Sequence, residues 1–258
     1  MNTNQIICPA CGASDSESTK LKIKPSGRSE TVYCKCHNCK SFFNPSSNNI
    51  IDEIGHTIST AWGGEETGKK LSFYKRLMYD SILNLLSIYS PPPASLMDVG
   101  CSYAGFITQA DKRGYKVYGT DILPTAVDFS KSLGFDVIQA STVVDANFNS
   151  PVFDVITVLD ANYYFNNQPL ELKIILNKLA HNGILAMRVV DKSWFYSMGI
   201  FISKFLPRIG RRIAEKSVND HLFSMPVSSL LKLLNQQDLK FYMLHPKVPC
   251  TVKTRLYL

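Results

Sequence analysis

From Ser95 onward the sequence alternates between short apolar stretches typical of strands and longer stretches with helical periodicity. The predicted strands are residues 95–100, 115–121, 135–140, 153–160 and 184–190. The predicted helices between them are residues 104–114, 124–134 and 168–183, the last of them closed by Gly183. Because the strands are almost continuously apolar, both of their faces should be buried. This alternation predicts a doubly wound α/β domain, a parallel sheet with helices on both faces.

The segments on either side of this region fit the same domain. Residues 65–90 have apolar side chains at helical spacing, and the three prolines at 91–93 should end that helix. An aromatic and basic insertion follows the fifth strand, and a helix over residues 226–236 and two strands over residues 239–246 and 250–258 complete the chain. We predict that the domain covers residues 71–258, with residues 192–225 as a lid-like insertion.

Five of the seven cysteines lie in the first 40 residues and include two Cys-x-x-Cys pairs. The four cysteines of these pairs are Cys8, Cys11, Cys36 and Cys39. Four thiolates can form a tetrahedral zinc site, and the metal would substitute for the hydrophobic core that so short a segment lacks. Cys34 or His37 is an alternative for one ligand, although we assign Cys34 to a strand. We therefore predict a zinc ribbon with a structural zinc ion over residues 1–45, followed by a linker over residues 46–70.

The composition is that of a globular protein, because apolar residues make up 45% of the chain and charged residues 19%. The first residues lack the pattern of a signal peptide, and no stretch approaches the ~18 apolar residues of a membrane span. We therefore expect a cytoplasmic protein without a transmembrane segment. The net charge of +7 favours anionic partners, and six basic residues against one acid lie between Lys192 and Lys216.

The first predicted strand leads into a turn of small residues, from Asp98 to Gly105. Such a turn lets the backbone approach a ligand closely, and the following helix offers unpaired N–H groups. Asp121, at the end of the second strand, stands where a carboxylate can accept both ribose hydroxyls of a nucleoside. A nicotinamide dehydrogenase also fits these features. Asp98, directly before the turn, favours instead a ligand with a cationic amino group.

The runs Asp98–Phe106, Gly119–Ile122, Phe153–Ile156 and Gly183–Val190 resemble those of class I S-adenosylmethionine-dependent methyltransferases, and the resemblance covers roughly residues 70–258. The whole chain is similar to methyltransferases of bacterial polysaccharide and natural-product pathways. The resemblance implies a Rossmann-like, doubly wound, seven-stranded sheet with a parallel core and an antiparallel C-terminal strand. The cofactor-binding residues that it implies are Asp98, Gly100, Ser102, Gly105, Asp121, Ile122, Gln139, Ser141 and Asp160.

Two features depart from the family pattern. Ser102 and Ala104 replace glycines of the turn, and Tyr163-Tyr164 stands where many relatives have Glu-His, the obvious general base. The remaining candidates for a catalytic base are His221, Tyr164 and Asp191. Among them we favour His221, because imidazole titrates near neutral pH. Capping or buttressing of the following helix is the alternative role for this histidine.

The sequence thus predicts a methyltransferase that acts on a hydroxyl of a sugar, nucleotide sugar or other small molecule. An RNA methyltransferase that uses the ribbon for recognition is one alternative, although the ribbon is only modestly basic and has few aromatic residues. A non-catalytic binding protein on the same fold is the other. The aromatic and basic insertion suits a lid over an anionic or sugar-linked acceptor, a peripheral contact with an anionic membrane, or a core or dimer contact.

Overall fold

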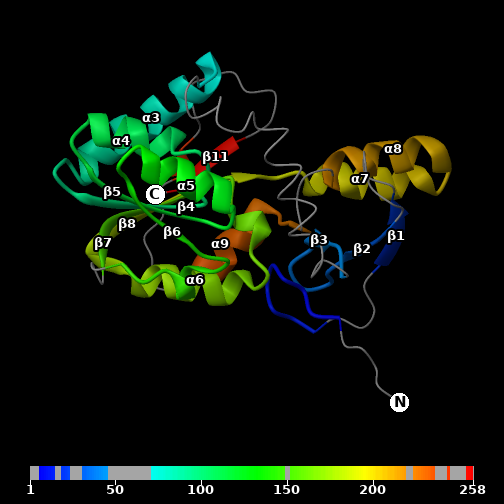
Figure 1. Cartoon of the computed structure of the whole chain (residues 1–258). Coiled ribbons are helices and arrows are strands. Elements are labelled where there is room, and N and C mark those ends of the chain that lie inside the picture. The colour runs from blue at the N-terminus through cyan, green and yellow to red at the C-terminus, as the bar shows by residue number, and fades with distance from the viewer. Residues whose placement is uncertain are drawn as a thin grey trace. The chain divides into compact units, whose positions relative to one another are not determined.

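The computed structural model describes residues 6–14, 19–23, 31–45, 71–148, 152–218, 223–235, 243–244 and 254–257. The chain divides into two compact units, whose elements are labelled in Figure 1. Unit 1 comprises Met1–Ile54, Asn162–Pro169 and Val190–Lys240. Unit 2 comprises Gly55–Ala161, Leu170–Val189 and Phe241–Leu258.

Unit 2 contains a sheet of seven strands, counted over the described residues, in the order β10-β11-β8-β7-β4-β5-β6. The strands are β4 (Ser95–Val99), β5 (Lys116–Asp121), β6 (Asp136–Gln139), β7 (Phe153–Leu159), β8 (Leu179–Val190), β10 (Met243–Leu244) and β11 (Thr254–Tyr257). The pairs β4–β5, β5–β6, β4–β7 and β7–β8 are parallel, and β10 and β11 pair antiparallel. This order and these directions confirm the predicted Rossmann-like sheet.

Among the described residues, four helices accompany this sheet, at the places in the chain where the sequence predicts helices. They are α3 (Phe73–Tyr89), α4 (Gly105–Lys112), α5 (Pro124–Ser132) and α6 (Gln168–Asn177), although α3 begins at Phe73 rather than at residue 65 and α6 ends before residue 183. Ser72 caps α3 by accepting a hydrogen bond from the Lys75 N–H, and Pro124 begins α5 with a fixed φ and no donor to lose. Ala104, in the left-handed region with φ 56°, begins α4 directly from the turn after β4.

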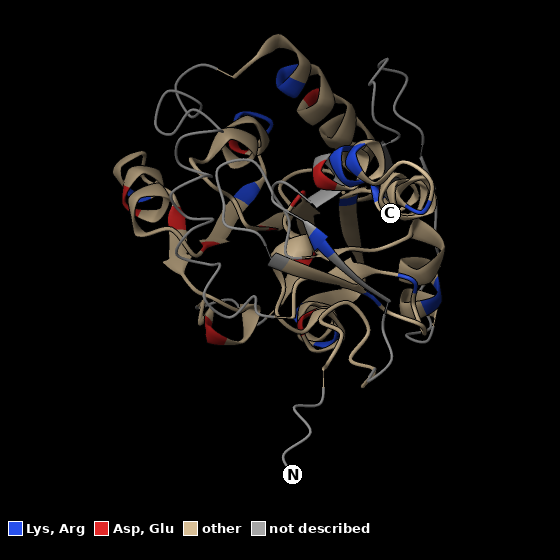
Figure 2. Ribbon diagram, turned by 90° about the vertical axis from the view of Figure 1, so that its right-hand side faces the viewer, with Lys and Arg blue, Asp and Glu red and all other residues tan. Residues whose placement is uncertain are grey.

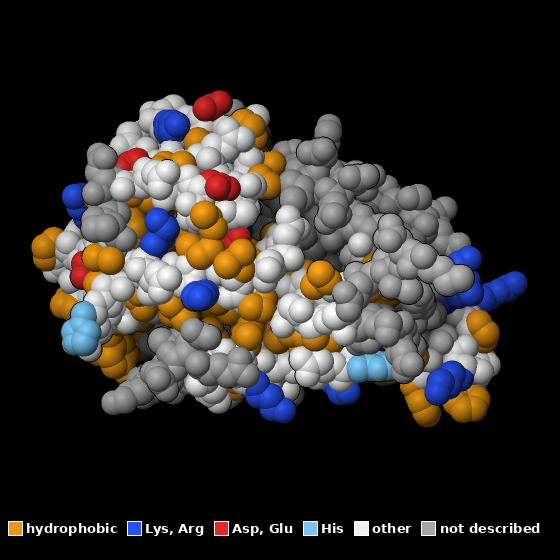
Figure 3. All heavy atoms as spheres, turned by 90° about the horizontal axis from the view of Figure 1, so that it is seen from below, with side chains coloured by type: hydrophobic (Ala, Val, Ile, Leu, Met, Phe, Trp, Pro, Cys, Tyr) orange, Lys and Arg blue, Asp and Glu red, His pale blue; other side chains and the backbone are white. Residues whose placement is uncertain are grey.

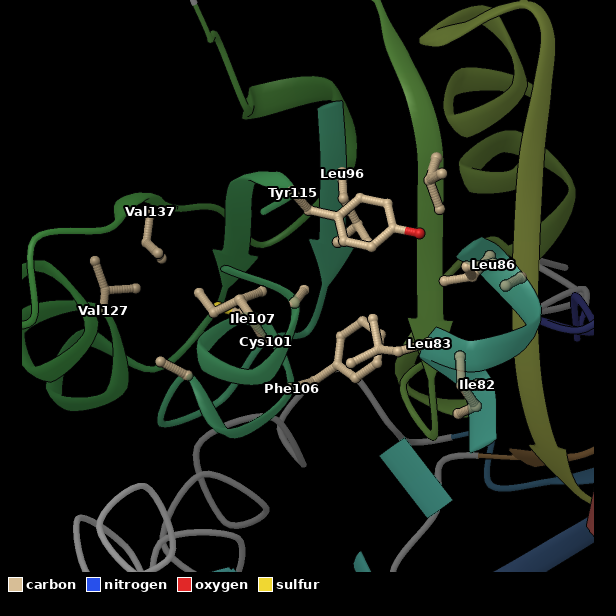
Figure 4. Close-up of a cluster of buried hydrophobic side chains, with 14 residues drawn as sticks. Ile82, Leu83, Leu86, Leu96, Cys101, Phe106, Ile107, Tyr115, Val127 and Val137 are labelled. Atoms are coloured by element: carbon tan, nitrogen blue, oxygen red, sulfur yellow. The ribbon is translucent and has the colours of Figure 1, made fainter. Parts of the chain in front are cut away.

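The core of unit 2 lies between its helices and the sheet. Figure 4 shows Phe106 of α4 beside Leu83 and Ile82 of α3, and the three residues are at most 2% exposed. Leu96 of β4 and Val137 of β6 belong to the same buried cluster. Their burial provides the main hydrophobic stabilisation of the edge of the sheet at which β4 leads into α4.

The predicted end of α6 is wrong. Residues 179–183 were predicted as the end of a helix closed by Gly183, but α6 ends at Asn177 and these residues belong to β8. Leu179 pairs with Phe153 and Ile184 with Val155, so the register shifts and β8 bulges between these pairs. Asn182 takes the left-handed conformation (φ 61°) in this bulge. Pairing with β7 therefore overrides the helical spacing of the side chains.

Unit 1 is built on a four-stranded antiparallel sheet, counted over the described residues, in the order β1-β2-β3-β9. Its strands are β1 (Thr19–Ile23), β2 (Thr31–Lys35), β3 (Phe42–Phe43) and β9 (Phe223–Ser224). Its helices are α7 (Ser193–Ser203), α8 (Pro207–Val218) and α9 (Val227–Asn235). A strand from the C-terminal third thus completes the sheet of the cysteine-rich segment, so unit 1 extends beyond the predicted ribbon of residues 1–45.

Helix α7 is anchored on this sheet by one side. The rings of Tyr196 and Phe42 stack with their centroids 4.2 Å apart, and Tyr196 donates a hydrogen bond to the Tyr33 carbonyl over 3.4 Å. The Lys35 ammonium donates to the Ser197 hydroxyl over 2.9 Å. Tyr33, Phe42, Tyr196 and Ala214 of α8 form a small buried cluster, so both helices belong to the core of unit 1.

The backbones of α7 and α8 approach each other closely through two glycines. A Cβ atom on Gly210 would lie 2.3 Å from the Ser203 nitrogen and 2.5 Å from the Gly199 oxygen. A Cβ atom on Gly199 would lie 2.7 Å from the Ala214 nitrogen. These distances are far below van der Waals contact, so the helical pair depends on glycine at both positions. None of the described helices is long and apolar enough to span a membrane.

We expect Gly210→Ala to destabilise unit 1. In an isolated helix this change stabilises by up to ~1 kcal/mol, whereas a methyl group forced between two backbones costs about 1–3 kcal/mol. The sign of the change in the free energy of unfolding therefore tests the close approach. Arg212→Ala, at an exposed position of the same helix, is the control and should leave chemical denaturation unchanged. An increase in stability for Gly210→Ala would contradict the packing described here.

Candidate functional site

The two Cys-x-x-Cys pairs meet in unit 1. The sulfur atoms of Cys8, Cys11, Cys36 and Cys39 all lie within 4.8 Å of one another. Cys8 and Cys39 are 3.7 Å apart, and Cys11 and Cys36 are 3.8 Å apart. Zinc–sulfur bonds of about 2.3 Å in a tetrahedron give sulfur–sulfur distances of about 3.8 Å. The four thiols therefore fit a zinc ion.

The two turns that carry these cysteines have the same backbone design. In the first, Cys8 accepts a hydrogen bond at its carbonyl from the Gly12 N–H (2.8 Å) and donates its own N–H to Ala13 (2.9 Å). In the second, Cys36 accepts from Lys40 (3.0 Å) and donates to Ser41 (2.7 Å). Gly12 and Lys40 both take the left-handed conformation, with φ 72° and 61°. This conformation turns the chain back so that the sulfurs of each pair face the same point.

The other two cysteine-module candidates are not part of this group. Cys34 is buried in β2 and pairs with Phe43, as its assignment to a strand predicts. His37 is exposed, and neither residue belongs to the metal-binding group found among the described residues. Hydrogen bonding to Cys11 raises the pKa of Cys8 well above its usual range and that of Cys39 to about 12, whereas hydrogen bonding to Cys39 and Cys8 lowers the pKa of Cys11 to about 2. Four thiolates this close together would repel one another, so they need a cation between them.

The turn after β4 forms the centre of a second site, in unit 2. Gly100 has φ 78°, and a Cβ atom there would lie 2.7 Å from the Ala161 Cβ, so only glycine fits. Ser102 (φ 49°) and Ala104 (φ 56°) take the left-handed conformation that favours glycine. Small side chains thus preserve the turn, and α4 begins directly behind it at Gly105.

Asp121 joins the end of β5 to this turn. Its Oδ2 accepts a hydrogen bond from the Ser102 N–H over 2.7 Å, and its Oδ1 accepts from the Leu123 N–H over 2.9 Å. The residue is 8% exposed, and burial raises the pKa of its carboxyl group although these N–H groups oppose the shift. Fixed in this way, the carboxylate can still accept hydrogen bonds from a ligand through its remaining lone pairs.

Asp98 lies near the end of β4 and is only 3% exposed. Its Oδ1 accepts a hydrogen bond from the Thr157 hydroxyl over 2.6 Å. Desolvation by burial raises the pKa of Asp98 to about 7, and the negative charge of Asp121 adds to this rise. Two buried carboxylates therefore lie at adjacent strand ends, an arrangement that favours a ligand carrying a positive charge.

A pocket opens beside the turn. It is lined by Leu71, Lys75, Tyr79, Cys101, Ser102, Tyr103 and Gly105. Burial lowers the pKa of Lys75, and the positive charge of Arg188 lowers it further. Burial raises the pKa of Tyr79, and Asp98 adds to this rise. The pocket thus combines an ammonium group and a phenol with the backbone of the turn.

The other predicted cofactor residues in unit 2 follow the ends of β5, β6 and β7. Gln139 is exposed at the end of β6 and donates to the Ile122 carbonyl over 3.4 Å. Ser141 is exposed and donates to Asp145 over 3.4 Å. Asp160, in the left-handed region (φ 59°), forms an ion pair with Arg188 of β8. Since parallel strands end at one edge, these residues share the edge that carries Asp98 and Asp121.

Arg188 is a residue that the sequence analysis missed. It lies opposite Leu159 in the register of β7 and β8, and it pairs with Asp160 although its side chain is only 14% exposed. The signal in the sequence is a charged residue within the otherwise apolar stretch of residues 184–190. A buried charge in a strand of this kind indicates a partner or a ligand.

The three candidate bases belong to unit 1. Tyr164 is half-buried in a 3-10 turn (Asn162–Tyr164), with its ring 4.8 Å from that of Tyr163. His221 lies outside the described residues, two positions before β9. Asp191 accepts hydrogen bonds from the Ser193 N–H (3.0 Å) and hydroxyl (2.5 Å) and from the Val227 N–H (3.2 Å). These contacts fix the starts of α7 and α9, which favours a structural role for Asp191.

The first cysteine turn contacts the segment that carries Tyr164. The Gln168 N–H donates to the Pro9 carbonyl over 2.9 Å, and its side-chain amide donates to the Ala10 carbonyl over 3.5 Å. The fully buried Gln168 also accepts a hydrogen bond from the Asn162 side chain over 3.0 Å. The cysteine module therefore supports this segment directly, within unit 1.

Comparison with known proteins adds a family. The profile of a family described as a methyltransferase domain matches residues 71–243. A search of curated protein sequences finds no match. The plantazolicin methyltransferase BpumL in complex with a triazolic desmethylPZN analog and SAH is similar in fold, with a TM-score of 0.55 and 13% identity over 82% of this chain and 90% of that chain. The N-methyltransferase NodS from Bradyrhizobium japonicum WM9 has a TM-score of 0.51 and 13% identity over 71% and 93%.

We expect one zinc ion per chain, and we expect Cys8→Ser or Cys39→Ser to abolish its retention, because three thiolates leave the tetrahedral site open. Elemental analysis of the purified protein after dialysis measures this. Cys34→Ser, which changes an equally buried cysteine of the same module, is the matched control and should keep its zinc. Loss of zinc from Cys34→Ser together with retention in Cys39→Ser would refute the ligand set.

Proposed function

Because this chain belongs to the methyltransferase domain family, we propose that it transfers the methyl group of S-adenosylmethionine to a hydroxyl of a small-molecule acceptor, such as a sugar or nucleotide sugar of a biosynthetic pathway. The observation that carries the cofactor assignment is the pair of buried carboxylates, Asp98 and Asp121, at adjacent strand ends around the turn at Gly100. The plantazolicin methyltransferase BpumL, which is similar in fold, has been crystallised with SAH, and this agrees with the proposed methyl donor.

The predicted cofactor residues each have a role in this proposal. The buried carboxyl of Asp98 suits the amino group of the methionine part, and Asp121 suits the two ribose hydroxyls. Ile122 would pack on the adenine, and Gln139 and Ser141 would lie at its edge. Asp160, fixed by Arg188, would lie near the sulfonium. Asp98, Asp121 and the turn are all in unit 2, so this part of the proposal needs no residue of unit 1.

Methyl transfer from a sulfonium is an in-line displacement, in which the acceptor oxygen forms a bond to the methyl carbon as the carbon–sulfur bond breaks. Positioning of the acceptor therefore contributes most of the rate enhancement. A hydroxyl acceptor also loses a proton, which a base must take. We propose His221 for this role and Tyr164 as a wall of the acceptor pocket, while the hydrogen bonds of Asp191 at the starts of α7 and α9 favour a structural role for that residue.

The contacts of the ribbon support a small-molecule acceptor over RNA. Within unit 1 the first cysteine turn is engaged by Gln168, and β3 is covered at its edge by β9. The aromatic residues Tyr33, Phe42 and Phe43 are at most 1% exposed, so they offer no surface on which bases could stack. We therefore propose that the ribbon, with a structural zinc ion, supports the acceptor-side segments.

We expect Asp121→Ala to reduce the affinity for S-adenosylhomocysteine at least 100-fold, because the variant loses both acceptors for the ribose hydroxyls and leaves their N–H partners unpaired. Isothermal titration of the zinc-loaded protein measures this. Asp111→Ala, at an exposed site at the end of α4, is the control. No binding by the folded wild-type protein would overturn the enzyme assignment and leave a binding module.

The raised pKa of Asp98 predicts a pH dependence of cofactor binding. Below about pH 7 the free carboxyl is protonated, whereas a ligand ammonium group binds the carboxylate. The affinity for S-adenosylhomocysteine should therefore fall as pH decreases from 7.5 to 5.5, with a limit of about tenfold per pH unit. In Asp98→Asn the dependence should be shallower and the affinity at pH 7.5 lower. A wild-type affinity that does not change over this range would contradict the role of Asp98.

The acceptor can be identified by mass spectrometry of methylated products. The purified protein is incubated with S-adenosylmethionine and either nucleotide sugars or total RNA, and the expected product is an O-methylated sugar. His221→Ala and Tyr164→Phe are compared in the same assay, and a base at His221 predicts a loss of turnover that is smaller at high pH. Methylated RNA in place of a small product would overturn the proposed acceptor class.

A further inference from the structure

Helix α7 has a second apolar stripe besides the one that anchors it. Tyr196, Gly199 and Ile200 face the core of unit 1. The opposite face carries Trp194, Met198 and Phe201 at helical spacing, and Phe205 continues this spacing in the turn that follows the end of α7 at Ser203. The three aromatic residues of this stripe are exposed by 56%, 63% and 73%. A helix whose inner side is already packed thus presents a row of large aromatic side chains to solvent.

The following segment extends this apolar surface and adds positive charge. Leu206 and Ile209 are exposed by about half of their surface. Lys204, Arg208, Arg211 and Arg212 are all exposed, and the only acid in the described part of α8 with a defined side chain is the half-buried Glu215. Figure 2, in which the right-hand side of Figure 1 faces the viewer, shows the Lys and Arg residues of this helical pair in blue.

We call the exposed side chains of this helical pair the hairpin surface and define it by Trp194, Phe201, Phe205, Leu206, Ile209, Arg208, Arg211 and Arg212. Figure 3 shows hydrophobic side chains beside Lys and Arg side chains at its right-hand end, where α7 and α8 lie in Figure 1. The backbone approach of Gly199 and Gly210 holds the two helices together, so the surface is a built feature of the pair.

We propose that the hairpin surface binds the anionic surface of a phospholipid membrane. Aromatic and aliphatic side chains of a helix insert at the boundary of headgroups and acyl chains, while Lys and Arg beside them pair with lipid phosphates. The charge of the hairpin surface is complementary to such a membrane, and exposed apolar area of this size is unfavourable in water. The pair lies on the membrane, because no described helix is long and apolar enough to cross one.

A membrane partner also fits the contacts on the inner side of the pair. The stacking of Tyr196 on Phe42 and the hydrogen bond from Lys35 to Ser197 fix α7 on the sheet of unit 1. The outer stripe is therefore presented on a rigid support, and binding costs little conformational entropy. The inference rests on unit 1 alone and does not depend on the methyl-transfer reaction.

Cosedimentation with lipid vesicles tests the proposal. The zinc-loaded, full-length protein should sediment with vesicles of phosphatidylcholine and phosphatidylglycerol in equal parts and should stay in solution with phosphatidylcholine alone. Sodium chloride at 0.5 M should weaken the binding, because salt screens the pairing of arginine with phosphate. Equal binding to both vesicle types, or none to either, would overturn the proposal.

Two double variants separate the apolar and the charged contributions. Phe201→Ser with Phe205→Ser should reduce the partition coefficient at least tenfold. Arg211→Ala with Arg212→Ala should reduce the partition coefficient about 30-fold, since each basic residue near an anionic surface increases this coefficient about fivefold. The matched controls, Ile88→Ser with Leu133→Ser and Lys112→Ala with Lys131→Ala, change exposed residues of unit 2 and should bind as the wild type does.

A spectroscopic readout localises the contact. The chain has two tryptophans, so Trp62→Phe leaves Trp194 as the only indole. Its emission should shift to shorter wavelength with anionic vesicles and be quenched by brominated acyl chains. Binding of S-adenosylhomocysteine, measured on every variant, reports separately on unit 2, so failure of the membrane inference and failure of the proposed function are distinguishable.

Two other occupants of the hairpin surface would appear as distinct results. If a second copy of the chain covers it, the protein dimerises, the Phe201→Ser and Phe205→Ser variant is monomeric, and vesicles are not bound. If RNA covers it, the protein shifts RNA in a gel, the Arg211→Ala and Arg212→Ala variant does not, and vesicles are again not bound. Either result would overturn the membrane assignment.

Discussion

The meeting of four cysteine sulfurs is the contact on which the rest of unit 1 depends. It brings two turns together that belong to different parts of the N-terminal segment, at distances suited to one zinc ion. Cys8, Cys36 and Cys39 are themselves buried, and so are Phe42 and Phe43, which follow the second pair. Four thiolates this close together repel one another, so the packing of the two turns depends on a cation between them. Metal–sulfur bonds would therefore cross-link the two turns and stabilise the sheet that follows them.

In unit 2, the folded structure buries two carboxyl groups, which is costly in free energy. Asp98 and Asp121 are both more than nine-tenths buried at the same edge of the sheet, and the desolvation of each carboxyl group is only partly offset by its hydrogen bonds. The turn adds backbone strain at Ser102 and Ala104, both in the left-handed conformation. The cationic nucleoside ligand that we propose would relieve the electrostatic part of this cost.

Local patterns predicted much of this structure, and long-range pairing accounts for what they missed. The strands β4 to β7 are apolar runs between turn residues, and the two cysteine pairs have the spacing of metal ligands. Residues that are close together in the sequence therefore sufficed to predict both features. Strand β9 has two residues, too few for any periodicity, and it joins β3 from far along the chain. The start of β8 is set by its pairing with Phe153, against its helical side-chain spacing. The pairing of Arg188 with Asp160 likewise depends on the register of two strands.

The residues of the candidate site can be divided in the same way, into those that local patterns predict and those that long-range contacts fix. The proposed cofactor residues of unit 2 follow strand ends, and the order of strands in a doubly wound sheet brings such residues to one edge. Of the residues proposed for the acceptor side, Tyr164 lies in the segment that the first cysteine turn contacts through Gln168. Asp191 instead fixes the starts of α7 and α9, and β9 pairs with β3 of the cysteine module. Contacts between segments that are far apart in the sequence therefore fix this part of unit 1, and local periodicity could not predict them.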